Sequence, residues 1–186
     1  MSAFFHEEHF ENLNQIDKGE YENCIFKNCD FSDSDLSNFK FIGCHFMNSN
    51  LSLSKIYQTL FQKIHFSDCK LLGLNFNNCN DFSLSFIFEN SQLNHSSFFK
   101  LKIKKTIFRN CQMKECDFTQ TDFTESVFDN CNLEGAQFDF TNLEKTDFRT
   151  SFNFSLDPDQ NKIKGAMFSK ENVIGLLHKY NIKIES

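Results

Sequence analysis

Large apolar side chains recur at every fifth position along most of the chain. One series begins at Tyr21 and ends at Phe76, and a second begins at Phe88 and ends at Phe148. The two series hold 25 positions, and every one is Phe, Tyr, Leu, Ile or Met. Neither an α-helix, with 3.6 residues per turn, nor a flat strand, with a period of two, brings every fifth residue to one side. The spacing therefore predicts a solenoid that turns regularly and sends each central residue inward.

Small residues recur two positions before each central residue. At 20 of the 25 positions this residue is Gly, Ala, Ser, Thr or Cys, which fits beside a large side chain inside a narrow coil. Seven of the eight Cys lie there, and Cys79 continues the first series by one step. No Cys-x-x-Cys pair occurs, so we expect free, buried, reduced thiols rather than a disulfide framework or a zinc site. Occasional redox sensitivity is the alternative.

The units CDFTQ, TDFTE, CNLEG and TNLEK resemble the pentapeptide repeat family. Its unit is a small residue, Asp or Asn, Leu or Phe, and two variable residues, and the resemblance covers about residues 19–155. It implies an all-β solenoid, a right-handed quadrilateral β-helix with four pentapeptides per coil and one on each face. Twenty residues per coil then assign the inward Phe to three columns, namely Phe26, Phe46, Phe66 and Phe86; Phe98, Phe118 and Phe138; and Phe108, Phe128 and Phe148.

One interruption separates the two series, because the step from Phe76 to Phe88 is twelve residues rather than ten. The register break covers about residues 79–87, with the two extra residues near Asn80, Asp81, Phe82 and Ser83. A bulge that rotates the later repeats or relieves strain is the favoured interpretation. A protrusion that binds a partner is the alternative.

The two ends of the chain follow the repeat less closely. Residues 1–18 are expected to form an N-terminal cap, 19–155 the β-helix, and 156–186 a C-terminal extension with a short α-helix at about 170–180, capped by Ser169. The apolar face of this helix must pack on the last coil, on a second copy, or on both. In the Qnr and MfpA types of the family, C-terminal elements pair two rods, so the resemblance favours a homodimer over a monomeric cap. The residues expected at its interface are Val173, Leu176, Leu177, Tyr180, Ile182 and Ile184.

Composition narrows the classes of partner and location. The formal charge of −6, from 19 Lys and Arg against 25 Asp and Glu, opposes direct binding of nucleic acid. No apolar run approaches the roughly 18 residues of a membrane span, and the start lacks the basic n-region of a signal peptide. A cytoplasmic protein without membrane association is therefore expected.

Sequence motifs give no positive support for catalysis. The chain has no P-loop, Rossmann glycine pattern, HExxH, GxSxG or paired-cysteine zinc motif, so we expect neither an enzyme nor a cofactor. His45 and His65 are twenty residues apart and would stack on one face, close enough to share a metal ion. Because Ser85 would follow them in the column and two nitrogens are a sparse ligand set, solvated surface histidines are favoured over a metal site.

Acidic residues concentrate in the later repeats. Between Cys111 and Phe148 nine acids face two lysines, a local charge density similar to that of duplex DNA. A charged exterior also keeps such a rod soluble, and the coil arithmetic spreads the acids over all four faces. Lys100, Lys102, Lys104 and Lys105 form a basic band before them. Besides Glu115, the acids are the candidate partner-binding residues Asp117, Asp122, Glu125, Asp129, Glu134, Asp139, Glu144 and Asp147.

The resemblance to the Qnr and MfpA types implies a non-enzymatic interaction rod that binds DNA gyrase or topoisomerase IV by partial DNA mimicry and protects it from quinolones. Qnr proteins of Gram-negative bacteria carry longer projecting loops, whereas this chain offers only the two-residue break. A generic protein-binding scaffold without a topoisomerase role is the alternative, because a fold does not determine a function. A metal- or ligand-binding protein, based on His45 and His65, is a third.

Overall fold

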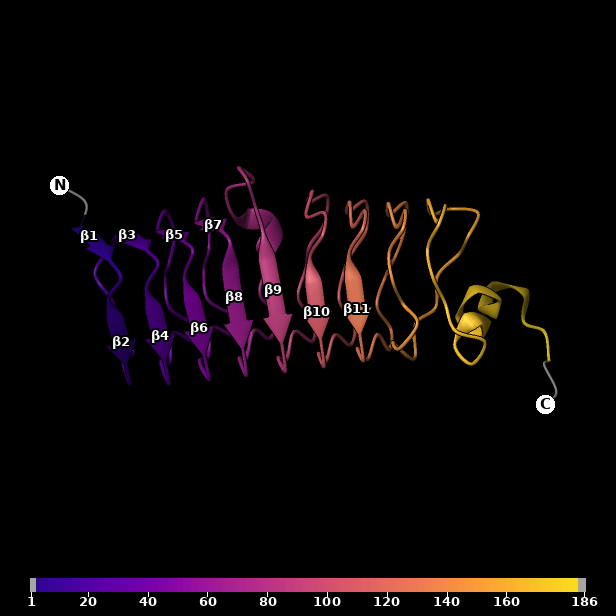
Figure 1. The fold of residues 1–186 in the computed structure, drawn as a ribbon, viewed down its shortest axis with the longest axis horizontal. Helices are drawn as coiled ribbons and strands as arrows, with labels where there is room; N and C mark the ends of the chain where they lie inside the picture. The colour runs from indigo at the N-terminus through magenta and orange to yellow at the C-terminus, as the bar shows by residue number, and fades with distance from the viewer. Residues whose placement is uncertain (1–2, 184–186) are drawn as a thin grey trace.

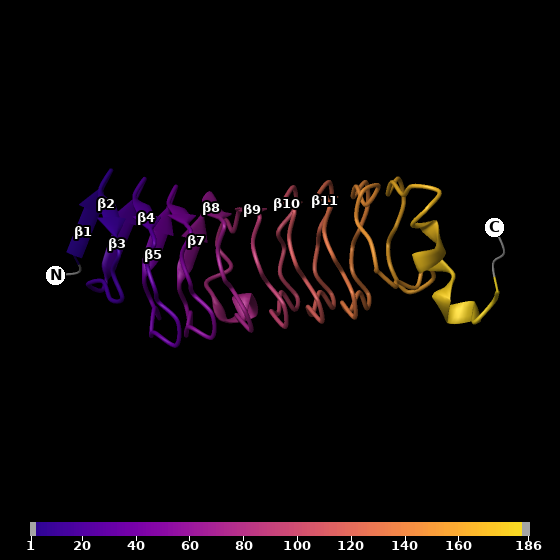
Figure 2. The ribbon, with the colours of Figure 1, turned by 90° about the horizontal axis from the view of Figure 1, so that it is seen from below.

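The computed structural model describes residues 3–183 as a rod of stacked coils, with β1 at one end and the last helical turn at the other (Figure 1 and Figure 2). Its strands are short because each side of a coil holds only one pentapeptide. The elements in chain order are β1 (Ala3–His6), β2 (His9–Glu11), β3 (Gly19–Glu22), β4 (Ile25–Lys27), β5 (Lys40–Ile42), β6 (His45–Met47), β7 (Leu60–Gln62), β8 (Ile64–Ser67), the 3₁₀ turn η1 (Phe76–Asn78), β9 (Phe86–Glu89), β10 (Ile107–Arg109), β11 (Val127–Asp129), and the 3₁₀ turns η2 (Val173–Leu176) and η3 (His178–Tyr180).

Parallel pairing between successive coils forms the sides of the rod. One sheet has the order β1-β3-β5-β7, and a second has the order β11-β10-β9-β8-β6-β4-β2. Isolated parallel bridges join the other two sides, as between Asp30 and Asn50 and between Asp35 and Lys55. Paired residues lie twenty apart along most of the rod, which gives four sides per coil. The predicted quadrilateral β-helix is confirmed.

The corners explain why the chain turns every five residues. The residue two positions after a central residue adopts a left-handed conformation, with φ of 55° at Asp33 and 62° at Asn38. The N–H of Ser34 then donates to the carbonyl oxygen of Phe31 at 3.2 Å, as in a type II turn. Asn, Asp and Gly tolerate this conformation best, which accounts for their frequency at these corners.

Burial follows the sequence pattern closely. All 25 central residues are buried, and the most exposed of them, Phe138, shows 3% of its surface. The eight cysteines are free and buried. Seven of the eight thiols donate to backbone carbonyls, as Cys44 does to Tyr21 at 3.2 Å. Burial raises the pKa of Cys44, Cys69, Cys79 and Cys116 to about 12.

A ladder of nine stacked phenylalanines runs through the core of the rod. Ring centroids of successive members lie between 4.7 and 5.5 Å apart, with nearly parallel planes. Eight steps of about 4.8 Å give the rod a length of roughly 38 Å between its first and last rungs. The members are Phe10, Phe26, Phe46, Phe66, Phe88, Phe108, Phe128, Phe148 and Phe168.

The predicted column that begins at Phe26 and the one that begins at Phe108 therefore form a single column. The prediction placed Phe86 above Phe66, but Phe66 pairs with Phe88 and stacks on it at 5.3 Å, while Phe86 pairs with Ile64. The two inserted residues shift the pairing between β8 and β9 from twenty to 22. Because the chain absorbs the insertion in a bulge, the inward register of the later coils continues that of the earlier ones.

Stacking extends beyond the expected β-helix at both ends. β1 and β2 lie within residues 1–18 and pair with β3 and β4. At the other end Asp147 bridges Met167, which brings residues after 155 into the last coil.

The predicted α-helix at about 170–180 is wrong, because η2 and η3 form there instead. The Asn172 N–H does donate to Ser169 Oγ at 3.2 Å, as the predicted cap requires. However, Gly175 is buried against Phe154, and its carbonyl oxygen accepts from the Leu156 N–H at 3.1 Å. Glycine weakens a helix, and the bond to Leu156 uses a carbonyl that an α-helix would need. The segment therefore follows the end of the rod in 3₁₀ turns.

Candidate functional site

The acidic later repeats are largely neutralised by basic residues on adjacent coils. Five of the eight candidate partner-binding acids form ion pairs between 2.6 and 3.6 Å, and most of these pairs join residues twenty apart. The pairs are Asp122 with Lys104, Glu125 with Lys105 and Lys145, Asp129 with Arg109, Glu134 with Lys114, and Asp147 with Arg149. Arg149 holds the pKa of Asp147 below its usual range through a hydrogen bond. Glu115 lies 3.3 Å from His95.

Three candidate acids, Asp117, Asp139 and Glu144, have no ion-pair partner within 4 Å in the stretch 3–183. The stacking register places Asp117 and Asp139 on one side of the rod and Glu144 on the next. The candidate acids thus do not form a single stripe along the rod, as the spacing of twenty residues per coil predicted. The spacing of twenty between opposite charges was a sequence signal that could have located these ion pairs.

His45 and His65 stack face to face on the side formed by β6 and β8. Their ring centroids are 4.2 Å apart with an interplanar angle of 1°. His45 Nε2 lies 2.9 Å from Ser67 Oγ, and His65 Nε2 lies 3.0 Å from Glu89 Oε2. Burial and the adjacent His65 lower the pKa of His45. Ile87, rather than the expected Ser85, follows His65 in the column.

These histidines do not form a metal centre with further ligands. No group of three or more His, Cys, Asp or Glu positioned to hold a metal ion occurs within residues 3–183. The Nε2 atom of each ring instead hydrogen bonds to a protein oxygen, and Glu89 continues the network to Arg109. The arrangement is a polar network on the surface of the rod.

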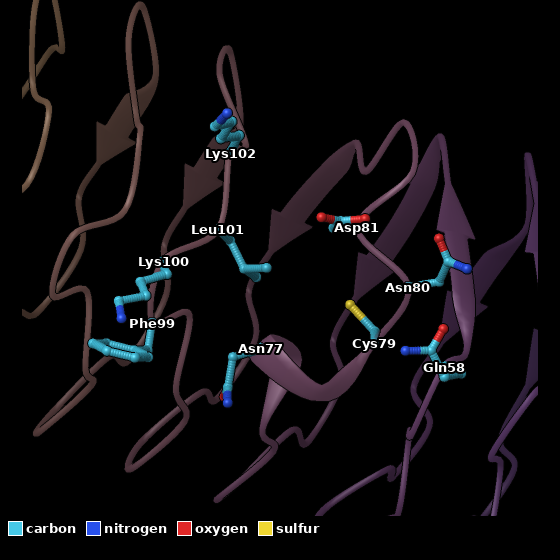
Figure 3. Close-up of a pocket in the computed structure, with 9 residues that line it drawn as sticks. All are labelled: Gln58, Asn77, Cys79, Asn80, Asp81, Phe99, Lys100, Leu101 and Lys102. Carbon is cyan, nitrogen blue, oxygen red and sulfur yellow. The ribbon is translucent and has the colours of Figure 1, made fainter.

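The register break opens a cavity near the middle of the rod. The segment after η1 rises above the neighbouring coils (Figure 1), and Phe82 projects from it with 68% of its surface exposed. Beside it lies a cavity of about 420 Å³. Lys100 lies over the ring of Phe99 with its Nζ 4.7 Å from the centroid. The lining residues, shown in Figure 3, are Gln58, Asn77, Cys79, Asn80, Asp81, Phe99, Lys100, Leu101 and Lys102.

Apolar side chains gather at the C-terminal end, where the dimer interface was expected. Val173, Tyr180 and Ile182 are exposed by 39%, 56% and 56%, whereas Leu176 packs on the core and Leu177 is half-buried. Ile174, which the helical spacing did not select, is exposed by 43% because the 3₁₀ turns rotate it outward. Ile184 lies outside the described residues. No helix among residues 3–183 has the length and apolar character to cross a bilayer.

Comparison with known families agrees with the geometry of the coils. A profile of the pentapeptide repeat region matches residues 20–98, and one of pentapeptide repeats, in eight copies, matches residues 111–149. The chain belongs to the pentapeptide repeat family. The first match includes the register break, and the basic band of this pentapeptide repeat protein lies between the two matches. A search of curated protein sequences gave no significant match.

Solved structures with the same fold include QnrB1, a plasmid-mediated fluoroquinolone resistance protein. Full-length QnrB1 matches with a TM-score of 0.63 and 19% identity, over 97% of this chain and 100% of QnrB1. A trypsin-treated QnrB1 variant matches with a TM-score of 0.56 and 20% identity, over the whole of both chains. HetL from the cyanobacterium Nostoc, a pentapeptide repeat protein involved in heterocyst differentiation regulation, matches with a TM-score of 0.37 and 12% identity over 88% of this chain and 85% of its own.

Proposed function

We propose that this pentapeptide repeat protein is a non-enzymatic rod that binds DNA gyrase or topoisomerase IV in the cytoplasm and protects it from fluoroquinolones. The observation that carries the proposal is the match to QnrB1 along the full length of that chain, ends included. Two proteins of one fold and one length present surfaces of similar extent to a partner. QnrB1 is a fluoroquinolone resistance protein, and we infer a similar role for this chain.

The dimensions of the rod support an interaction surface of DNA-like size. Its roughly 38 Å spans about eleven base pairs at about 3.4 Å each. The exposed apolar end, with Val173, Tyr180 and Ile182, supports a homodimer that would double this length. Homodimer interfaces are typically more apolar than the remaining surface of a protein.

Partial DNA mimicry, as part of this proposal, depends on the unpaired acids Asp117, Asp139 and Glu144. Of the five ion-paired acids, Glu125 and Glu134 are exposed and the other three are half-buried, and surface ion pairs contribute only about 0–1 kcal/mol each. A partner with basic side chains can therefore exchange those pairs at small cost. The acids still outnumber the basic residues of these coils, so the region keeps a negative field.

A supercoiling assay with DNA gyrase and ciprofloxacin tests the proposal. Titrated protein should restore supercoiling at drug concentrations that otherwise stop it, and Asp117→Asn with Asp139→Asn and Glu144→Gln should weaken this effect. A matched triple variant of the ion-paired Glu125, Glu134 and Asp147 to their amides should weaken it less. Absence of rescue over a wide range of protein concentration, with the gyrase of the same organism, would refute the topoisomerase role.

A generic protein-binding scaffold is the second candidate function. The placement of acids on all four sides and the pairing of five of them favour it, since a DNA mimic benefits from one continuous stripe. The same assay separates the candidates, because a scaffold without a topoisomerase role leaves supercoiling and its inhibition by ciprofloxacin unchanged.

A further inference from the structure

The hydrogen bonding between coils is interrupted at the register break. On this side of the rod the Asn80 N–H donates to Thr59 at 2.9 Å, and the Asp122 N–H donates to Leu101 at 2.8 Å. The intervening step, from the coil of Asp81 to that of Lys102, forms no bridge. In the described stretch 3–183, the backbone N–H and carbonyl oxygen of Lys102 have no protein hydrogen-bond partner across this gap.

The cavity of about 420 Å³ lies in this gap. Its walls include three consecutive residues of one coil, Cys79–Asp81, and four of the next, Phe99–Lys102, together with Gln58 and Asn77. The side chains of Leu101 and Cys79 extend between the two coils, and the carboxylate of Asp81 lies above them (Figure 3). The volume is within the 300–1,000 Å³ typical of ligand sites, and its walls expose a strand edge rather than a closed sheet.

The charge around the cavity is basic. In the basic band, Lys104 and Lys105 pair with Asp122 at 3.3 Å and Glu125 at 3.6 Å. Lys100 and Lys102 line the cavity, and neither has a carboxylate within 4 Å among residues 3–183. Asp81 is the single acid of the lining, so the wall carries a net positive charge.

We propose that this cavity binds an extended acidic segment of a partner protein, whose backbone supplies the hydrogen bonds that Lys102 lacks. Addition of a strand to an exposed sheet edge is a common mode of peptide recognition, in which main-chain bonds give affinity and side-chain contacts give specificity. Acidic side chains of the segment contact Lys100 and Lys102, and an apolar one packs on Phe99 and Leu101. The site does not require that the partner be a topoisomerase.

A display library of random 12-residue peptides, selected against the immobilised protein, supplies the probe. Enriched peptides should carry at least two acids, and their affinity should fall about tenfold or more when Lys100→Glu and Lys102→Glu are combined. The matched control combines Lys162→Glu with Lys164→Glu. Lys162 occupies the corresponding column in the last coil, where its N–H donates to Thr141 at 3.1 Å and the ladder is complete. This control should change the affinity less than twofold.

A second variant separates backbone pairing from charge. Deletion of Asp81 and Leu84 restores a spacing of twenty, closes the gap and keeps both lysines, so it should abolish peptide binding. If that variant fails to fold, amide exchange of the wild-type protein gives the same information, because bound peptide should slow exchange of the Lys102 N–H. No enrichment, equal binding to the Lys100 and Lys102 variant, or an unchanged Lys102 exchange rate would each overturn the proposal. Each of these outcomes is independent of the supercoiling result.

Discussion

Truncation of one rung of the phenylalanine ladder tests the stacking that holds the rod together. Phe128 is fully buried, and its ring lies 4.8 Å from both Phe108 and Phe148 in stacked geometry. Phe123 also contacts it edge-on at 5.2 Å. The coils above and below are fixed by their hydrogen-bond ladders, so they cannot collapse into the space that Phe128→Ala leaves. We expect a loss of about 3–5 kcal/mol in the free energy of unfolding, as for other buried Phe-to-Ala changes.

Two controls isolate the inward register as the cause. Phe140→Ala removes the same side chain from a corner where it is 66% exposed, and we expect a change below about 0.5 kcal/mol. Asp129→Ala changes the residue beside Phe128 and removes an exposed ion pair with Arg109, which contributes about 0–1 kcal/mol, and a surface hydrogen bond from the Thr150 hydroxyl. Urea unfolding followed by circular dichroism gives all three values, provided that the m-values agree. Equal midpoints for Phe128→Ala and Phe140→Ala would refute the reasoning.

Four further predictions concern thiols, pH and the C-terminal end. All eight thiols should react with a thiol reagent only after unfolding, and a disulfide or bound zinc would contradict this. The free energy of unfolding should fall above about pH 9, because thiols in the unfolded chain ionise near their ordinary pKa, whereas Cys44, Cys69, Cys79 and Cys116 in the folded protein stay protonated to about pH 12. Each of these thiols contributes up to about 1.4 kcal/mol per pH unit. Cys69→Ala should therefore lower the slope of the urea midpoint against pH. Gly175→Ala should speed tryptic cleavage at Lys179, since the new Cβ would lie 2.5 Å from the Phe154 carbonyl oxygen; unchanged cleavage would contradict the packing. Val173→Asp should convert the proposed dimer into monomers with an unchanged circular dichroism spectrum in light scattering, whereas a monomeric wild type would exclude the dimer.

The sequence predicted the inward positions fully because a five-residue period has only one inward register. It could not predict how the chain accommodates the two extra residues, because the five-residue period does not determine whether the later coils are rotated or keep the alignment of the earlier ones. The continuation of Phe66 by Phe88 depends instead on pairing between β8 and β9. Apolar spacing after Ser169 predicted a helix, but the tertiary contact of Gly175 with Phe154 determines the local structure there.

The candidate acids were predicted to face outward, and their ion pairs were not predicted. Neutralisation depends on partners one coil away, as between Lys114 and Glu134, rather than on neighbours in the chain. The gap beside Lys102 also could not be predicted, because the identity of a residue does not indicate whether its backbone groups are hydrogen bonded.

The two-residue insertion has a consequence for how the chain finds one alignment. Coils that carry Phe at equivalent inward positions stack almost equally well on one another. A folding rod, or two chains that exchange coils, could therefore pair each coil with the wrong neighbour, shifted by one coil. An offset of 22 occurs at a single step, and only coils carrying the bulge satisfy it. In a rod misaligned by one coil, the bulge of residues 80–85 would lie against a coil whose hydrogen bonds require a spacing of twenty residues. The two-residue insertion thus fixes which coil pairs with which, because it distinguishes the middle of the rod from its otherwise interchangeable coils.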